Sequence, residues 1–361
     1  MRQRFVIFSG IFLIMALSNA IVPVLPDLGE TSTHHGAIFS AYFLGALLMV
    51  FPAGIFSDRL GRTHFIRAGL LLTCAGSALI LASVIPAVVI AGRLVEGIGA
   101  GLFLPVALSW ANSGEMHEKM SGFFFASLNI GLVAGLVISG YLAVMTQYHL
   151  AGLVVLLALG IIVLLVSLTR KAVFNDTVPK SQAPARVVSV ILDYKWLFIF
   201  SLVAIGATGA VTTLYPEFSG EDPFFVSVEI GMMNISTAIT VLWISRMKLE
   251  PIPVMQASAL GMAVAVLISF VTPVGLALMG AVAGAVMISQ TAFLARTGHP
   301  QGLMMGLFSL FSYGGMSLIP FIAGVTADLA GFAAAFILVA LLCAVMILTV
   351  QRCMCRLPVT V

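Results

Sequence analysis

Long apolar runs separated by short polar turns are the feature that most constrains the fold of this chain. Each run is about long enough to cross the ~30 Å hydrocarbon core of a bilayer as one helix. Six runs precede a polar stretch at roughly 170 to 190, and six follow it. We therefore expect an all-α membrane protein of twelve transmembrane helices, with two six-helix halves (1–169 and 191–361) joined by a linker (170–190). The runs lie at roughly 4–26, 36–56, 65–85, 87–110, 121–143, 150–169, 192–216, 224–245, 253–271, 274–295, 302–324 and 331–351.

The composition supports a chain dissolved in lipid. Hydrophobic residues make up 61% of the chain and charged residues 9%, with a mean hydropathy of +1.15, whereas about a quarter of residues are charged in soluble domains. The 34 glycines predict helices packed through small residues, and the lack of a long alternating strand pattern argues against an outer-membrane barrel. The net charge of +3 is small, so we expect no nucleic-acid partner. The four cysteines lack the spacing of a metal site, and we expect neither a metal nor a cofactor.

Basic residues fall on one side of the expected bundle. If the N-terminus is cytoplasmic, sixteen of the seventeen Lys and Arg lie at or near the cytoplasmic face, and the outer loops carry acids without a basic residue. This bias is what the positive-inside rule requires for twelve spans. We expect a cell-membrane protein with both termini and the linker in the cytoplasm. The basic start of the chain could also open a signal peptide, but the first apolar run continues to Pro26, so we expect it to be retained.

A charged turn between the second and third runs reads Gly-Ile-Phe-Ser-Asp-Arg-Leu-Gly-Arg over residues 54–62. Glycine at 54 allows another helix to approach closely, and glycine at 61 frees the backbone to reverse. The spacing resembles the G-x-x-x-D-R-x-G-R signature between helices 2 and 3 of the major facilitator superfamily of transporters. A generic positive-inside loop is the alternative. The resemblance implies a conformational gate formed by Gly54, Asp58, Arg59, Gly61 and Arg62, with Asp58 near a helix that starts at about Gly302 and Arg59 near Glu115 or Glu118.

The fourth run contains an intramembrane arginine, Arg93, with Glu96 three residues further on the same helical face. Such an arginine costs at least about 2.5 to 3.5 kcal/mol on insertion scales, so it should face a cavity or a partner. The segment from Arg93 to Gly101 resembles the R-x-x-x-G-x-G motif of helix 4 in the same superfamily, whose arginine is associated with proton coupling. The resemblance implies that Arg93 and Glu96 form a proton-coupling site. The alternative is a structural ion pair that only neutralises Arg93.

Glycines recur along the fifth run with the spacing G-x8-G-x3-G, followed by a further glycine. This spacing resembles a helix-5 pattern associated with antiporters, although Leu136 stands where the pattern has proline and Ser139 replaces one glycine. Ordinary small-residue helix packing is the alternative. The glycines of this helix-packing motif are Gly122, Gly131, Gly135 and Gly140.

Polar side chains at membrane depth are candidates for the substrate cavity. For each one alone, a hydrogen bond between helices is the simpler explanation. The 18 methionines and 25 phenylalanines predict a soft interior that suits varied apolar or cationic molecules, although lipid-facing packing explains the same counts. The candidates are Asn19, Asn129, Tyr215, Glu229, Asn234, Gln290 and Tyr313.

These features together resemble the twelve-helix drug:proton antiporter branch of the superfamily. We expect a secondary active transporter, not an enzyme, that moves small amphipathic or cationic molecules by alternating access, with efflux coupled to proton entry. Its expected partners are a small-molecule substrate, protons and the lipid bilayer, and we expect a monomer without catalytic residues. A proton-coupled or facilitative carrier of one sugar, amino acid or organic anion is the nearest alternative. A non-transporting receptor on the same scaffold is the alternative from another class.

Overall fold

The computed structural model describes residues 2–112, 117–169, 187–247, 250–299 and 301–351. Every regular element in these ranges is a helix. Eleven helices are long and apolar enough to cross a membrane, and the apolar part of α13, Phe332–Leu348, is a shorter twelfth. The prediction of an all-α membrane protein is therefore confirmed. The helices are α1 (Arg2–Ala20), η1 (Val22–Leu28), α2 (Ser32–Leu60), α3 (Arg62–Ala82), α4 (Pro86–Asn112), α5 (His117–Thr146), α6 (Ala151–Leu168), α7 (Val187–Asp193), α8 (Lys195–Ser219), α9 (Pro223–Ile244), α10 (Pro251–Ser269), α11 (Val274–Ala295), α12 (Gln301–Ala330) and α13 (Phe332–Gln351).

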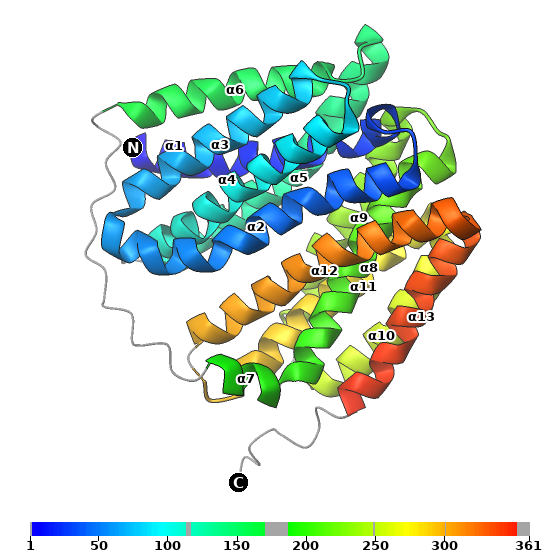
Figure 1. Cartoon of the computed structure of the whole chain (residues 1–361). Coiled ribbons are helices and arrows are strands. Elements are labelled where there is room, and N and C mark those ends of the chain that lie inside the picture. The colour runs from blue at the N-terminus through cyan, green and yellow to red at the C-terminus, as the bar shows by residue number, and fades with distance from the viewer. Residues whose placement is uncertain (1, 113–116, 170–186, 248–249, 300, 352–361) are drawn as a thin grey trace. The chain divides into compact units, whose positions relative to one another are not determined.

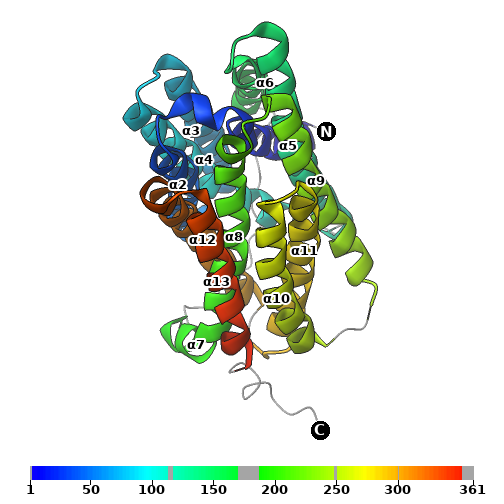
Figure 2. The same cartoon turned by 90° about the vertical axis from the view of Figure 1, so that its right-hand side faces the viewer.

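The chain separates into two compact units with matching internal packing. In the first unit α3 packs against α4 and α6, and α5 packs against α6 (Figure 1). In the second unit α10 packs against α11 and α13, and α12 packs against α13 (Figure 2). Helices α3, α4, α5 and α6 of the first unit thus pair in the same way as α10, α11, α12 and α13 of the second. Two six-helix pseudo-repeats require such a correspondence. The first unit comprises Met1–Glu30, Ala37–Gln182 and Ser219–Val228, and the second comprises Thr31–Gly36, Ala183–Phe218 and Glu229–Val361.

The first apolar run is not a single helix, which corrects the expected span of 4–26. Helix α1 ends at Ala20, and a 3₁₀ helix, Val22–Leu28, follows it. Two prolines, Pro23 and Pro26, lie in this second segment. Proline has no backbone N–H and clashes with the preceding turn of an α-helix, so the apolar run continues only as the tighter, shorter helix. A further helix, α7, begins at Val187, inside the range expected to be a linker; residues 170–186 lie outside the described part of the chain.

Glycines set how closely the helices of the first unit approach one another. A Cβ atom added at Gly99 would lie 2.6 Å from the Gly69 carbonyl oxygen, and one added at Gly76 would lie 2.5 Å from the Gly92 carbonyl oxygen. Since Gly69 and Gly76 are on α3 and Gly92 and Gly99 are on α4, these two antiparallel helices touch backbone to backbone at both levels. Small residues allow this kind of approach in membrane helices. The level between the two contacts holds Glu96.

Candidate functional site

Arg93 lies in α4, with its side chain fully buried against α2. The exposed fraction of this residue is 0%, although a guanidinium group carries a permanent charge. Its Nε donates a hydrogen bond to the carbonyl oxygen of Ile38 at 3.4 Å, and its Cζ lies 4.6 Å from the centre of the Tyr42 ring. A cation above an aromatic face at this distance is attracted by the negative face of the ring. Helix α2 therefore supplies Arg93 with an acceptor and an aromatic surface.

Glu96 faces the other neighbour of α4, helix α3. Its Oε2 accepts a hydrogen bond from Nη1 of Arg93 at 2.7 Å, and its Oε1 accepts one from the Ser77 hydroxyl. Only 1% of the surface of Glu96 is exposed. Both carboxylate oxygens are thus paired inside the bundle, one within α4 and one to α3. The four side chains of Tyr42, Ser77, Arg93 and Glu96, which we call the Arg93 cluster, connect α2, α3 and α4.

The cluster exists because small residues bring the three helices together around it. A Cβ atom at Gly97 would collide with the carbonyl oxygen of Tyr42, which places the backbones of α4 and α2 in contact. The Gly76 contact does the same for α4 and α3, since a Cβ atom there would lie 2.6 Å from Cγ of Glu96. Longer residues at these positions would separate the helices and leave the charges without partners. Glycines of both α3 and α4 therefore allow the close helix contacts that surround the charged pair.

The chemistry available to the cluster is that of one buried ion pair. A pair out of water is tolerated only when good geometry and further hydrogen bonds offset the cost of desolvation, and Ser77 and Ile38 supply such bonds. One donor of the guanidinium group, Nη2 of Arg93, is buried without a hydrogen-bond partner among the described atoms. The cluster can hold one proton on Glu96 only if the charge of Arg93 finds other compensation. Among the described residues, no group of three or more His, Cys, Asp or Glu side chains could hold a metal ion.

The expected gate is described only in part. Gly61 has a φ of +87° and stands between α2 and α3, so the backbone reverses at a residue that tolerates positive φ. Arg62 is buried and donates from Nη2 to the Ser109 hydroxyl at 3.1 Å. At Gly54 no described atom lies within 4 Å of an added Cβ, so the expected close approach of a helix is not seen there. The side chains of Asp58, Arg59, Glu115 and Glu118, and the surroundings of Gly302, lie outside the described part of the structure.

The glycines of the fifth run have different surroundings. An added Cβ would collide with the Phe12 carbonyl oxygen at Gly131 and with the Ala16 carbonyl oxygen at Gly135, which places α5 directly on α1. At Gly140 it would collide with Pro223 and Ser227 at the start of α9. At Gly122 it would meet no atom within 4 Å. The packing role thus belongs to the three later glycines of the motif in this structure.

Most of the polar residues expected in a substrate cavity form hydrogen bonds within their own helix or to a neighbouring helix. Asn19 donates to the Leu132 carbonyl oxygen across α1 and α5 at 3.2 Å, and Gln290 donates to the Ser201 hydroxyl across α11 and α8 at 2.8 Å. The Tyr215 hydroxyl donates to Glu229 at 2.9 Å. Asn129 and Asn234 donate to carbonyl oxygens of their own helices. Tyr313 is half-buried in α12. Of these seven residues, only Tyr215 and Glu229 are joined to each other by a described hydrogen bond.

Two members of the Arg93 cluster, Tyr42 and Ser77, were not singled out by the sequence. A hydroxyl group in an apolar run is common, because serine and tyrosine readily satisfy themselves within or between helices. The signal that could have identified Ser77 is its place beside Gly76, on a helix whose small residues recur at positions 69, 73 and 76. Tyr42 had no comparable signal.

Comparison with known proteins gives the family. The model of the Major Facilitator Superfamily matches residues 7–247. The quinolone resistance protein NorA of Staphylococcus aureus is 29% identical over 177 residues, and the matched stretch covers 46% of this chain and 44% of NorA. The nucleoside transporter NupG, solved as a mutant, has a TM-score of 0.77 at 18% identity, covering 98% of this chain and 99% of NupG. The POT family transporter PepTSo has a TM-score of 0.77 at 12% identity, covering 98% of this chain and 97% of PepTSo. The chain therefore belongs to the Major Facilitator Superfamily and is a multi-pass membrane transporter rather than an enzyme.

Proposed function

We propose that this transporter exports small amphipathic or cationic molecules across the cell membrane by alternating access, in exchange for protons that enter through Glu96. The observation that carries the proposal is the buried ion pair between Arg93 and Glu96, with Ser77 as a further donor. The partial likeness to the quinolone resistance protein NorA supports the export of drug-like molecules. The expected topology, with both termini and the linker in the cytoplasm, belongs to the same proposal.

The coupling follows from the charges of the Arg93 cluster. A proton bound to Glu96 cancels the negative charge that compensates Arg93, and an unpaired buried charge is strongly unfavourable. Protonation therefore favours an arrangement in which the guanidinium group reaches water or another anion. Deprotonation favours the paired arrangement seen here. Each proton that enters is worth about 2.3 kcal/mol per 100 mV of membrane potential, so one titrating carboxylate is enough to couple.

The test is proton release from the purified protein in detergent when candidate substrates are added, measured over a range of pH because Glu96 must carry a proton before the substrate binds. The panel contains lipophilic cations, sugars and organic anions, and it compares the wild type with Glu96→Gln. The control is Glu221→Gln, because Glu221 is an exposed acid in the loop between α8 and α9. We expect lipophilic cations to displace protons from the wild type and from the control, and Glu96→Gln to abolish the release. Proton release that persists in Glu96→Gln would contradict the assigned role of Glu96.

A second candidate function is the carriage of one anionic metabolite. It is favoured by the buried Nη2 of Arg93, which has no hydrogen-bond partner among the described atoms and could donate to a substrate anion. In that case one organic anion from the panel binds saturably without proton release. Glu96 then serves only as the structural partner of Arg93.

A further inference from the structure

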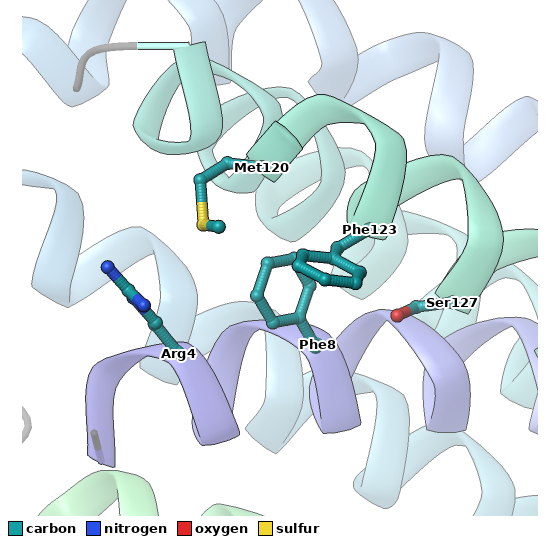
Figure 3. A pocket seen from close by; sticks show the side chains of 5 residues that line it. All are labelled: Arg4, Phe8, Met120, Phe123 and Ser127. Atoms are coloured by element: carbon teal, nitrogen blue, oxygen red, sulfur yellow. The ribbon is translucent and has the colours of Figure 1, made fainter. Parts of the chain in front are cut away.

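A cavity of about 290 Å³ lies between α1 and α5 in the first unit, and the proposed coupling mechanism does not use it. Pockets for drug-sized molecules typically measure about 300 to 1,000 Å³, so this one is just below that range. The lining residues come from both helices, with a charged group at one end and a hydroxyl group at the other (Figure 3). They are Arg4, Phe8, Met120, Phe123 and Ser127.

The pattern of residues on the two helix faces explains why a cavity forms at this level. Phe12 and Ala16 of α1 lie against Gly131 and Gly135 of α5, and the matching order shows that the two helices run in parallel. Residues four apart lie on the same helical face, so Phe8 and Arg4 continue this face of α1 toward the N-terminus. On α5 the same face continues through Ser127 and Phe123, which are not glycines. The helices therefore touch at the glycine levels and are further apart at the next levels, where larger side chains lie between them and only partly fill the gap.

The chemistry of the cavity selects a particular kind of molecule. The rings of Phe8 and Phe123 pack edge to face with their centres 5.8 Å apart, and they lie between Arg4 and Ser127 (Figure 3). Aromatic walls favour flat aromatic rings, and Met120 adds a soft, adaptable surface. Arg4 is the only charged member of the lining. A guanidinium group matches the two oxygens of a carboxylate and repels cations.

We infer that this cavity binds small aromatic carboxylates, with the acid group on Arg4 and the ring system against Phe8, Phe123 and Met120. The inference rests on the proposed function only for the statement that the bound molecule is a substrate; it concerns the amphipathic substrates and assigns to this cavity those with an anionic or zwitterionic polar end. The anionic head of a membrane lipid carries similar chemistry. The small volume and the aromatic side chains of the lining favour a compact two-ring acid over a lipid with two long chains.

Binding is measured through Trp110, whose ring centre lies 6.5 Å from that of Phe8. The chain has three tryptophans, so replacing Trp196 and Trp243 by phenylalanine leaves Trp110 as the only reporter. The probe is 2-naphthoate, which accepts energy from tryptophan. Its matched partners are 2-naphthylmethylammonium and 2-naphthalenemethanol, which have the same ring system with a positive charge or no charge. We expect saturable quenching by the naphthoate and at least tenfold weaker binding of the ammonium compound.

Three variants locate the site. Arg4→Gln should weaken naphthoate binding about tenfold, which corresponds to about 1.4 kcal/mol, while binding of the neutral alcohol stays the same. Arg246→Gln removes one exposed charge just after α9 and should change nothing. Ser127→Phe should fill the cavity and abolish binding of all three probes. Unchanged naphthoate affinity in both Arg4→Gln and Ser127→Phe would overturn the inference.

The competing lipid occupant and the proposed function are separated by two further arms. In nanodiscs, phosphatidylglycerol that displaces the naphthoate competitively, where phosphatidylcholine does not, would show a lipid site and overturn the substrate assignment. In the proton-release assay, naphthoate binding at Arg4 without proton release would leave the cavity assignment standing and contradict coupling. Proton release by other molecules, together with no naphthoate binding, would support coupling and overturn the cavity assignment.

Discussion

At the scale of single residues, the Arg93–Glu96 pair makes each charge depend on the other. Both side chains are buried, with 2.7 Å between Nη1 and Oε2. Removing one partner of such a pair typically costs about 3 to 5 kcal/mol, whereas replacing both by uncharged residues is often neutral. We therefore expect Glu96→Gln to lower the thermal unfolding midpoint in detergent markedly and the double variant Arg93→Met, Glu96→Gln to recover most of the loss. Glu221→Gln is the surface control, and equal midpoints for Glu96→Gln and the wild type would contradict a charged pair in the resting protein.

The residues of this cluster differ in how far the sequence could predict them. Arg93 and Glu96 could be identified because charges inside an apolar run are costly and a spacing of three places them on one helical face. Ser77 and Tyr42 could not, because each belongs to a different helix and meets the pair only through the register between helices. That register is set by glycine contacts such as that of Gly97 with Tyr42. Local sequence patterns do not predict this register between helices.

At the scale of elements, the glycines of α5 offer a matched pair for testing helix packing. A Cβ atom at Gly135 would collide with the Ala16 carbonyl oxygen of α1, whereas one at Gly122 would meet nothing within 4 Å. Replacing a helical glycine by alanine without steric conflict gains about 0.5 to 1 kcal/mol. We expect Gly135→Ala to lower the unfolding midpoint by forcing α1 and α5 apart, and Gly122→Ala to leave it unchanged or raise it. A comparable loss in both variants would show that backbone flexibility, and not close packing, is what these glycines provide.

The first turn of α2 is capped from another part of the sequence. The backbone N–H groups of Ser32 and Thr33 donate to the two carboxylate oxygens of Asp328, each at 2.9 Å. The first N–H groups of a helix have no partner within it, and losing a cap costs about 0.5 to 2 kcal/mol. We expect Asp328→Ala to destabilise the protein by roughly that amount in chemical or thermal unfolding. Glu30→Ala, an exposed acid close by in the sequence, should have no effect, and a similar loss there would point to net charge as the cause.

Element boundaries show where sequence reasoning about helices stops. The apolar pattern identified the spans because a bilayer demands about 20 apolar residues per helix. It did not show that α1 ends at Ala20, because the residues that follow, including Pro23 and Pro26, are themselves apolar. Hydropathy describes whether a segment avoids water. The backbone chemistry of proline decides whether that segment remains one helix.

At the scale of the whole molecule, the repeated packing of α3 with α4 and α6, and of α10 with α11 and α13, follows from two runs of six spans. The repeat could be expected from the count of apolar runs and from small residues shared by equivalent helices. Gly135 and Gly315 illustrate this, since added Cβ atoms there would collide with carbonyl oxygens of α1 and α8, respectively. The polar contacts are less regular, because they depend on individual side chains that differ between the repeats.

The last prediction concerns the orientation of the bundle in the membrane. The distribution of basic residues predicts that the turns before α4 and before α11 face the outside and that the turn after α9 faces the cytoplasm. Single cysteines at Val84, Val271 and Ser245 report these turns, since Val84 and Val271 are 84% and 83% exposed and Ser245 is also exposed. The background replaces Cys74, Cys343, Cys353 and Cys355 by alanine. We expect an impermeant maleimide to label Val84→Cys and Val271→Cys in intact cells, and Ser245→Cys only after permeabilisation. The opposite pattern would invert the topology, whereas disagreement between Val84→Cys and Val271→Cys would mean an odd number of spans between them, because an even number returns the chain to the same side.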